Sequence, residues 1–585
     1  MQRAPLEGSS AAAVGTRLRR LRDRRLLRVI STAHWSTPDH GNPCLVWTLL
    51  THPGAEPFDS GSNRRGEVVG GVRSAVRKRS GTSLVLRGLE AVDRAGNKLP
   101  HPFWLFVALA VVVVLASWLL AALGVAVVSP ADGERIAVRS LVSGDGVRMM
   151  LGDLIDNFVN FPPLGLIVVI MLGVAVADKS GLLPALMRGA LARVPAKLVT
   201  FAIALTSMFG QVAGDAAFVV LIPLAMIAYR AIGRSPVIGA IVGYVSVGGA
   251  SSIGLVITGS DAVFAGVTTS AARTIDPGYV VTPVSNYYFS AVSSVVLAIS
   301  ITVVTELVVA RRIAAMNRAE PELTEVEELP DMTLSAAERT GVRRALVVAA
   351  AFLAGVVLAV LPSGSPLRGA GGSVVDSPLM ANIAVVLMVF FLVIGVVYGV
   401  AAGTITAPGD VPELMAQGLR ELVPVLVLFF AASQFLGYFK WSNVGQVIAI
   451  SGAQLLGDLG ARPVPIFLGA ILFVSALNLL LTSGSAMWTL VAPVLVPMLM
   501  LLHIQPEMTQ AVFRIADAPT NSLTPMSPYF VIALGFIRRY RPSAGVGTLM
   551  SLVLPLAVVN LCVWTLLFLA WYGLGLPLGP GVPAR

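Results

Sequence analysis

Apolar stretches of about twenty residues recur throughout this chain, and they restrict the folds open to it more than any other feature. A membrane's hydrocarbon core needs about 20 apolar residues per helix. The chain has 585 residues, of which 56% are hydrophobic and 13% charged, and its mean hydropathy is +0.81; soluble domains carry roughly 25% charged residues. We therefore predict an all-α polytopic membrane protein. The clear candidate spans are Phe103–Val128, Pro163–Leu183, Val237–Ile257, Phe289–Ala310, Ala345–Leu361, Leu379–Ala402, Leu422–Phe439 and Gly545–Leu574.

Two further apolar regions are interrupted, and the interruptions allow two interpretations. Leu198–Tyr229 is broken at "GQVAGD" and Pro465–Leu502 at "TSGS". Each break is either a loop between ordinary helices or the tip of a hairpin that enters and leaves the bilayer on one side. Lys and Arg in short loops stay preferentially in the cytoplasm. A single crossing by the first region would place Arg230 and Arg234 outside and invert every later basic loop, so we predict hairpins.

The charge distribution then predicts about nine transmembrane helices plus two oppositely oriented re-entrant hairpins. The hairpins occupy about residues 198–229 and 465–502, and Met508–Ile537 crosses as a broken span. The N-terminus is predicted to be cytoplasmic and the protein to be multi-pass in the cell inner (plasma) membrane, because the basic tail precedes the first span.

The two broken regions resemble each other when Gly214 is aligned with Gly484, and we call this separation along the chain the repeat offset. Residues 214–224 read "GDAAFVVLIPL" and residues 484–494 read "GSAMWTLVAPV". Five predicted spans, an odd number, lie between the hairpins, so the second copy is inverted relative to the first. Inverted repeats with discontinuous helices mark the binding site of secondary transporters. The predicted structural breaks are Gly214, Gly484, Pro506 and Pro519.

Polar residues at the two hairpin tips are candidates for ion coupling or substrate binding. Asp215 follows Gly214, and its repeat partner is the neutral Ser485. Asp215 could carry a coupling proton or ligate a cation, or it could cap a helix N-terminus; the same capping interpretation applies to Ser485. Trp488 could be ordinary packing or a stacking wall for an aromatic substrate, and Asn478 lies ten residues before it.

A second polar group occupies "AVFRIADAPTNSLTPMSPYF". Arg514 and Asp517 are three residues apart and therefore neighbours on a helix face. They could form a structural ion pair, or a binding floor in which Arg514 meets a substrate carboxylate and Asp517 exchanges the coupling proton. Pro519, Pro525 and Pro528 are expected to unwind the chain that follows.

Composition excludes several other classes of function. Two cysteines and five scattered histidines give no metal-ligand spacing. No phosphate-binding loop appears, so we expect no cofactor and coupling to an ion gradient rather than to ATP. The net charge of +10 arises mainly in residues 1–100, which hold 17 Lys and Arg against 8 Asp and Glu, so no nucleic-acid partner is expected.

The expected organisation has three parts. Residues 1–87 form a basic, disordered cytoplasmic tail; Leu18–Ile30 could alternatively lie on anionic lipid as an amphipathic helix, and part of the tail could stem from a start codon assigned too far upstream. Residues 88–577 form the transporter domain, and residues 578–585 form a C-terminal tail.

Several segments together resemble the p-aminobenzoyl-glutamate transporter (AbgT) family. They include "GLEAVDRAGNKLPHPFWLFV", "ITGSDAVFAGVTTSAA", "FFAASQFLGYFKWSNVG" and "ADAPTNSLTPMSPYF". The resemblance implies a homodimer with nine spans and two opposed hairpins per subunit. It also implies uptake of p-aminobenzoyl-glutamate and proton-driven export of sulfonamide antimetabolites. The positions that match functionally implicated family residues are Asp215, Asn478, Ser485, Trp488, Pro506, Arg514, Asp517 and Pro525.

We therefore predict an ion-gradient-driven secondary transporter, not an enzyme, for p-aminobenzoyl-glutamate or related aryl-amide and sulfonamide antimetabolites. The coupling ion is predicted to be H⁺, with Na⁺ as the alternative. A sodium-coupled dicarboxylate carrier of the same wider superfamily is the main rival, although Trp488 suits a flat ring better than a small diacid. A channel or an inert membrane scaffold is the structurally different rival.

Overall fold

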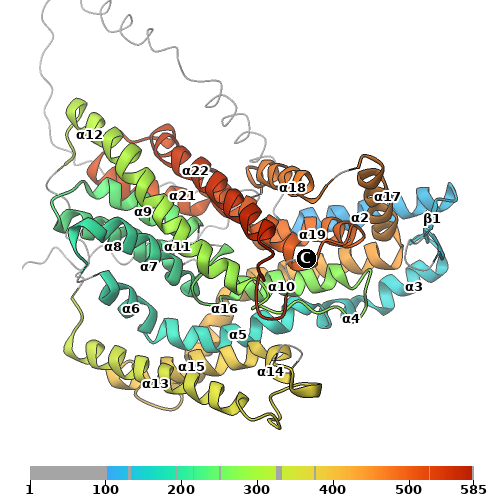
Figure 1. The fold of residues 1–585 in the computed structure, drawn as a ribbon, viewed down its shortest axis with the longest axis horizontal. Helices are drawn as coiled ribbons and strands as arrows, with labels where there is room; N and C mark the ends of the chain where they lie inside the picture. Colours follow the sequence, from blue (N-terminus) through green and yellow to red (C-terminus); the bar gives the residue numbers. More distant parts are fainter. Residues whose placement is uncertain are drawn as a thin grey trace, which may run out of the picture. The chain divides into compact units, whose positions relative to one another are not determined.

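The computed structural model describes residues 102–128, 133–191, 194–214, 216–249, 252–323, 333–374, 377–460, 462–481, 483–525 and 527–582. The predicted tail, residues 1–87, lies outside the described residues, and so does Asp215. The described chain is almost entirely helical, with a single two-stranded sheet among the described residues (Figure 1). The all-α prediction is therefore confirmed.

The first part of the described chain contains one apolar helix, a small hairpin of strands and a series of shorter helices. The first helix ends at Ala122 rather than continuing to Val128, and Gly124 adopts a left-handed conformation with φ of 68°. Strands β1 and β2 then pair antiparallel, with Ala126 opposite Ala137. The elements are α2 (Pro102–Ala122), β1 (Ala126–Val128), β2 (Arg135–Ala137), α3 (Gly144–Gly152), α4 (Leu154–Val159), α5 (Pro162–Lys179) and α6 (Leu182–Leu191).

The first predicted hairpin and the region after it are built from broken helices. Between the two arms, Gly214 has φ 56° and ψ −132°, a backbone conformation that favours glycine. The elements are η1 (Ala196–Leu198), α7 (Val199–Gly210), η2 (Gln211–Ala213), α8 (Ala216–Ala231), α9 (Pro236–Gly249) and α10 (Gly259–Ala272). The predicted span Val237–Ile257 is therefore wrong, because its helix stops at Gly249 and a second helix begins at Gly259.

Long helices form the middle of the chain. The helix that begins at Tyr287 continues through a π-helical turn, η4, into α12, and so extends beyond the predicted Ala310. The elements are α11 (Tyr287–Val304), η4 (Thr305–Val309), α12 (Ala310–Ala319), α13 (Ala336–Val360), η5 (Ala370–Gly372), α14 (Pro378–Ala381), α15 (Ile383–Ala402) and α16 (Asp410–Trp441).

The last part contains the second predicted hairpin and the second broken span. The break at "TSGS" is confirmed, since one helix ends at Asn478 and the next begins at Gly484. Pro519 does not unwind its helix, which continues to Asn521; the break follows at residues 522–527. The elements are α17 (Val444–Asp458), α18 (Pro463–Asn478), α19 (Gly484–Met500), α20 (Pro506–Asn521), α21 (Pro528–Tyr540) and α22 (Val546–Gly573).

Eight helices of the described chain are long and apolar enough to cross a membrane. Seven of them coincide with predicted spans, and the eighth, Ala196–Ala213, is the first arm of the predicted first hairpin. The two remaining predicted spans correspond to the broken pairs α9/α10 and α20/α21. The protein is therefore a multi-pass membrane protein, and the re-entrant course of the hairpins stays a prediction.

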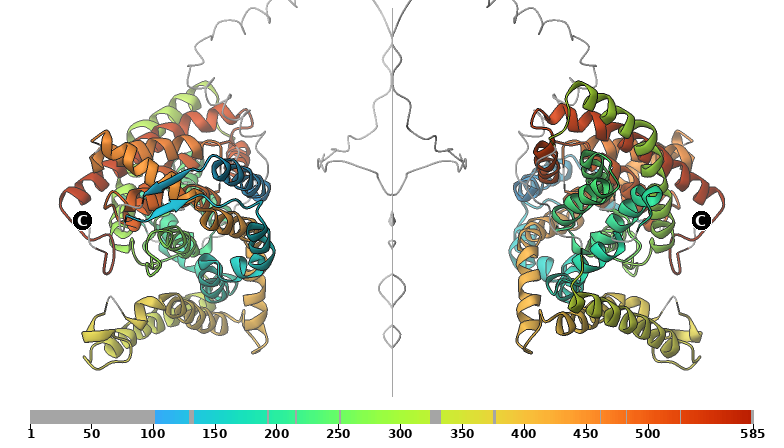
Figure 2. Two further views of the ribbon diagram at one scale, coloured as in Figure 1. Left: turned by 90° about the vertical axis from the view of Figure 1, so that its right-hand side faces the viewer. Right: turned by 90° about the vertical axis from the view of Figure 1, so that its left-hand side faces the viewer.

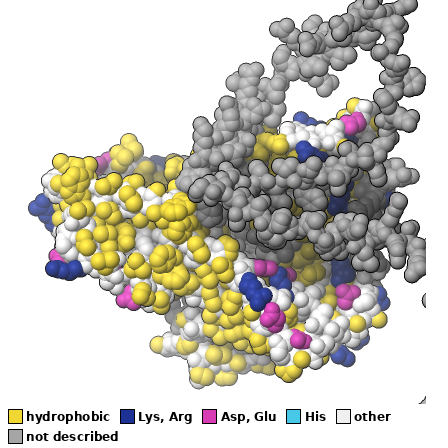
Figure 3. Space-filling model, turned by 180° about the vertical axis from the view of Figure 1, so that it is seen from behind, with side chains coloured by type: hydrophobic (Ala, Val, Ile, Leu, Met, Phe, Trp, Pro, Cys, Tyr) yellow, Lys and Arg dark blue, Asp and Glu magenta, His cyan; other side chains and the backbone are white. Residues whose placement is uncertain are grey.

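Apolar side chains cover much of the surface. On the face drawn in Figure 3 they form a broad continuous area, with charged side chains mostly toward its margins. Helix α13 is an example, because few of its residues are buried, and the apolar side chains of Leu353 and Val357 are exposed. A surface of this kind suits lipid rather than water.

Small residues allow the closest helix contacts. A Cβ on Gly173 of α5 would lie 2.1 Å from the carbonyl oxygen of Met388 in α15, and one on Gly395 of α15 would lie 2.7 Å from the nitrogen of Ala177. Membrane helices pack through such small residues because lipid offers little hydrophobic drive for association. Helices α13 and α15 lie side by side at the lower edge of Figure 1 and in both views of Figure 2.

Candidate functional site

The two broken helix pairs meet in the interior and follow the same repeat offset as the hairpins. Helices α9 and α20 both begin with a proline, and these two residues, Pro236 and Pro506, are separated by the repeat offset. The breaks that follow them contain Ser252 and Ser522, which are separated by the same offset. The repeat predicted from the hairpin tips therefore extends through the broken helices.

Reciprocal hydrogen bonds join the two broken pairs. The hydroxyl of Tyr244 donates to the carbonyl oxygen of Ser522 at 3.1 Å, and Nη1 of Arg514 donates to the carbonyl oxygen of Ser252 at 2.8 Å. Tyr244 and Arg514 are themselves equivalent under the repeat offset. Each break thus receives a donor from the equivalent helix of the other repeat, which satisfies backbone that would otherwise be unpaired inside the membrane.

Each predicted hairpin also binds the helix that follows it through a side-chain amide. Nε2 of Gln211 donates to the carbonyl oxygen of Val247. Nδ2 of Asn478 donates to the carbonyl oxygen of Asp517 at 2.7 Å and to Oγ1 of Thr520 at 2.8 Å. Val247 and Asp517 are equivalent under the repeat offset. The two halves therefore share a framework, but the charges of Arg514 and Asp517 lie on α20 alone, since α9 carries none.

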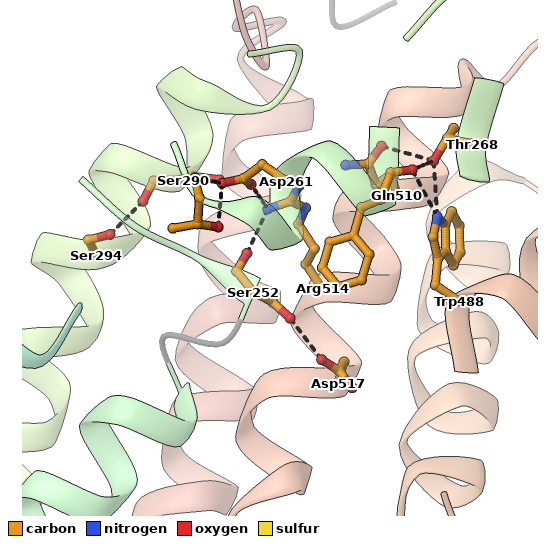
Figure 4. A network of polar contacts seen from close by, with 11 residues as sticks. Ser252, Asp261, Thr268, Ser290, Ser294, Trp488, Gln510, Arg514 and Asp517 are labelled. Atoms are coloured by element: carbon orange, nitrogen blue, oxygen red, sulfur yellow. Dashed lines mark hydrogen bonds and ion pairs between the residues drawn. The ribbon is translucent and has the colours of Figure 1, made fainter. Parts of the chain in front are cut away.

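Arg514 is the central cation of this region (Figure 4). Its side chain is 2% exposed, and Nη1 lies 2.6 Å from Oδ1 of Asp261, the second residue after the start of α10. The guanidinium carbon lies 5.0 Å from the ring centroid of Phe264, which is a cation–π contact. Nε of Arg514 is buried and has no hydrogen-bond partner within the described residues. One edge of the guanidinium is therefore unused.

Asp517 does not pair directly with Arg514, so the structural ion pair, one of the two sequence interpretations, is not formed in this conformation. The carboxylate of Asp517 instead accepts from Oγ of Ser252 at 2.8 Å and from Nδ2 of Asn521 at 3.1 Å. Ser252 bridges the two charged residues, since its carbonyl binds Arg514 and its hydroxyl binds Asp517 (Figure 4). Helical spacing alone brings two side chains to one face but does not choose their partners.

The tip of the second predicted hairpin contacts this carboxylate. A Cβ built on Gly484 would lie 2.9 Å from Oδ2 and 3.2 Å from Oδ1 of Asp517. Any larger residue at the tip would displace the carboxylate or the tip. The hairpin and α20 are therefore arranged so that movement of either changes the surroundings of Asp517.

Trp488 lies in the core, where it contacts α10 and α20. It is fully buried, and its indole N–H donates to Oγ1 of Thr268 at 3.0 Å. Its ring centroid lies 4.6 Å from that of Phe513. In this conformation the side chain packs, as one of the two sequence interpretations has it; a stacking role for a substrate ring stays a prediction.

The remaining predicted site residues occupy the helix ends around the same centre. Pro506 is the first residue of α20, and Pro525 lies in the break before α21. The cap of α19 is Ser483, whose Oγ accepts from the N–H of Ala486, so the capping interpretation of Ser485 is wrong. Among the described residues no group of three or more His, Cys, Asp or Glu side chains could hold a metal ion.

A second charged cluster, made of Thr200, Arg234 and Glu306, links both arms of the first predicted hairpin to η4 by hydrogen bonds. Arg234 binds both carboxylate oxygens of Glu306 at 2.8 Å, and Thr200 donates to the same carboxylate at 2.8 Å. The bond to Glu306 raises the pKa of Arg234 above its ordinary value despite partial burial. The cluster lies where α7 begins and where α8 has just ended, so it joins the two arms at their base.

Comparison with known proteins places this arrangement in a family. A family model for AbgT transporters matches residues 87–585. The chain belongs to the AbgT transporter family. It is 37% identical over 495 residues to the p-aminobenzoyl-glutamate transport protein of Escherichia coli (strain K12), covering 84% of this chain and 96% of that protein. Members of the family transport substrates across membranes and are not enzymes.

Two solved structures share the fold. The crystal structure of the Alcanivorax borkumensis YdaH transporter superposes with a TM-score of 0.77 at 36% identity, covering 82% of this chain and 100% of that one. Neisseria gonorrhoeae MtrF, which is described with a class of antimetabolite efflux pumps, gives a TM-score of 0.77 at 36% identity and covers 85% and 100%. The similarity extends over most of this chain and the whole of both relatives.

Sequence reasoning missed Ser252, Asp261 and the whole of α10. Two signals could have found them. Thr258 and Asp261 have the spacing of a helix-capping box, which marks a helix start. The repeat offset, applied to the proline-broken segment after Pro506, would have predicted a break after Gly249.

Proposed function

We propose that this protein is a proton-driven secondary transporter of p-aminobenzoyl-glutamate or of related aryl-amide and sulfonamide antimetabolites. The observation that carries the proposal is the buried Arg514, which has an unused guanidinium edge and is linked to Asp517 through Ser252. An arginine with a free N–H edge suits a substrate carboxylate, which binds guanidinium groups through two parallel hydrogen bonds. The E. coli relative is named for a substrate that carries carboxylates.

Asp517 is the proposed coupling residue. It is 1% exposed, and it contacts both the second hairpin tip and the break between α9 and α10. An ionised carboxylate without a directly bound cation is costly at this depth, which favours proton uptake. Asp215 at the first tip is the competing candidate. Asn478, Ser485, Trp488 and Pro525 complete the proposed substrate site around these charges.

Sodium coupling is the alternative, and one observation favours it. Oδ1 of Asn478 is buried and has no donor within the described residues. Oxygen atoms of this kind ligate hard cations. A sodium-coupled dicarboxylate carrier would use the same framework, and imposing proton and sodium gradients separately distinguishes the two.

We further propose that the protein is a homodimer in the inner membrane. The family resemblance and the exposed apolar surface support this proposal. Native mass spectrometry from detergent would give twice the chain's 61.1 kDa mass for a dimer, whereas a single-chain mass at all protein concentrations would contradict it.

Reconstituted vesicles test the transport mechanism. Radiolabelled p-aminobenzoyl-glutamate and a labelled sulfonamide are offered under an imposed proton gradient, an imposed sodium gradient or neither. Asp517→Asn should abolish proton-driven accumulation while exchange persists, because substrate contacts remain without the titrating group. Arg514→Ala should lose substrate binding itself. Asp458→Asn, at the exposed end of α17, is the matched control and should transport at the wild-type rate.

The results also separate the rival functions. Accumulation of substrate against its own gradient would exclude a channel. If no substrate crosses the membrane in any condition, the protein is an inert scaffold rather than a transporter of these substrates. If the Asp517→Asn protein accumulates substrate under a proton gradient at the wild-type rate, Asp517 is not the coupling residue. A loss confined to Asp215→Asn would transfer that role to Asp215.

A further inference from the structure

Arg514, the cation that is proposed to bind the substrate, forms an ion pair with Asp261 of the same chain. Oδ1 of Asp261 lies 2.6 Å from Nη1 of Arg514, and their side chains are 14% and 2% exposed. Asp261 is the only acidic partner of Arg514 among the described residues. A buried arginine without such a partner would be strongly unfavourable, so Asp261 neutralises the charge of Arg514 in this structure.

The two oxygens of Asp261 have separate tasks. Oδ2 accepts from the N–H of Thr258 at 2.8 Å and from its hydroxyl at 2.9 Å, which stabilises the start of α10. Oδ1 alone binds Arg514. The start of the helix can therefore keep its cap when the ion pair opens.

The bond between Asp261 and Arg514 is weaker than the guanidinium could make with another carboxylate. Asp261 uses a single nitrogen, which it shares with the carbonyl of Ser252. Nε has no partner within the described residues, and one face of the guanidinium is covered by Phe264. Two parallel hydrogen bonds to a carboxylate are stronger and more directional than one, so a ligand that reaches the unused edge can compete with Asp261.

A small polar space borders the carboxylate of Asp261. Asp261 lines a small cavity together with Gly254, Tyr287 and Ser290. These lining residues come from the break after α9 and from α11. The hydroxyl group of Ser290 can donate to the oxygen that leaves Arg514, whereas the hydroxyl of Tyr287 already donates to the carbonyl oxygen of Leu255 at 3.2 Å.

We propose that Asp261 is an internal stand-in for the substrate carboxylate: it occupies Arg514 in the empty carrier, and the carboxylate of the substrate displaces it. The inference rests on the proposed function, because it requires a carboxylate-bearing substrate. Asp261 would thereby determine specificity for anionic ligands, because the substrate carboxylate and the Asp261 carboxylate compete for the guanidinium of Arg514.

Displacement leaves Asp261 without a cationic partner. Around its carboxylate, α20 contributes Arg514 and α11 contributes Tyr287, while α5 presents the uncharged Met171 at the start of α10. Asp517 lies beyond Ser252 and adds a second negative group rather than a cation. Once Arg514 is taken, no cation among the described residues of these elements faces Asp261, so hydrogen-bond donors alone stabilise the freed oxygen.

A matched pair of ligands tests the displacement. Binding of p-aminobenzoyl-glutamate and of its uncharged diamide is measured calorimetrically on the full-length purified protein. Asp261→Asn can keep the cap but cannot compete as an anion, so its affinity for p-aminobenzoyl-glutamate should rise about tenfold or more, while its affinity for the diamide should not change. Thr258→Val removes one hydrogen bond to the same carboxylate without touching the ion pair, and both of its affinities should match the wild type.

Two other outcomes would contradict the inference or the proposed function. If Asp261→Asn binds both ligands equally weakly, Asp261 only positions Arg514 and the inference is overturned, although the proposed substrate stands. If the wild-type protein binds neither ligand, the proposed function is wrong and the inference falls with it.

A second measurement covers the case in which Asp261→Asn does not fold. Hydrogen exchange at the start of α10 is followed in the wild-type protein with each ligand. p-Aminobenzoyl-glutamate should speed this exchange and the diamide should not, since only the anionic ligand releases Asp261 from Arg514. Equal exchange with both ligands would overturn the inference.

Discussion

A methyl group at the second hairpin tip should impair transport without unfolding the protein. In Gly484→Ala the new Cβ would lie 2.9 Å from Oδ2 of Asp517, whereas ordinary contact begins at 3.4 Å, so the carboxylate or the tip must shift. The backbone at Gly484 has no positive φ, and alanine there is not strained. The whole effect therefore falls on the contact with Asp517.

The magnitude follows from the hydrogen bond on the other side of that carboxylate. Ser252 Oγ lies 2.8 Å from Oδ2 of Asp517, and a shift of a few tenths of an ångström away from the serine would lengthen the bond beyond the normal range of about 2.5–3.0 Å. Losing a hydrogen bond to a buried charged acceptor costs about 1–3 kcal/mol. Since about 1.4 kcal/mol is tenfold in an equilibrium constant, we expect proton-driven uptake at low substrate to fall about tenfold or more.

The assay compares initial uptake rates in vesicles under a fixed proton gradient, with the melting temperature measured in parallel. Gly469→Ala is the matched control, because it lies in α18 of the same hairpin and its Cβ would meet no atom within 4 Å. A Gly484→Ala protein that transports at the wild-type rate would refute the reasoning. An equal loss in Gly469→Ala would show that the hairpin helices, not the contact with Asp517, set the rate.

Two further predictions concern the base of the first hairpin and the sides of the membrane from which the two hairpins enter. Glu306→Gln should speed hydrogen exchange at the base of the first hairpin, because the paired hydrogen bonds to Arg234 weaken; the pair is partly exposed, so we expect about 1 kcal/mol or less. The second hairpin is the internal reference, and unchanged exchange in both would contradict the role of the cluster. Single cysteines at Ala213 and Ser485, in a chain without native cysteines, should react with membrane-impermeant thiol reagents from opposite sides. Labelling of both from one side would reject the inverted hairpins.

Much of the fold could be predicted because the membrane constrains sequence strongly. Seven predicted spans coincide with long apolar helices, and both hairpin breaks lie where Gly214 and Gly484 interrupt apolar runs. The error at Val237–Ile257 has a physical cause. Its break contains no proline or charge, and it is sustained by hydrogen bonds from the other repeat, such as that from Arg514 to Ser252; hydropathy does not record such partners.

The candidate site was predictable in its residues but not in its pairing. Arg514 and Asp517 stand out because charges within apolar segments need a reason. Their spacing suggests that they bind each other, yet Arg514 binds Asp261, which lies 253 residues away. Asp261 lies directly after the break that precedes α10, and Arg514 lies about two helix turns before the break that follows α20. The crossing of the two breaks decides which carboxylate reaches the guanidinium.

The class of protein, the positions of most helices, the two hairpin breaks and the offset at which they repeat can all be read from the amino-acid sequence. These properties follow from local quantities, namely hydropathy, helix length and the conformational preferences of glycine and proline. Three features depend on the three-dimensional arrangement: α10 packs against α20, Ser252 joins Arg514 to Asp517, and Trp488 is buried. The reason is that hydrogen-bond and ion-pair partners depend on distances between segments far apart in the chain, which local preferences do not specify.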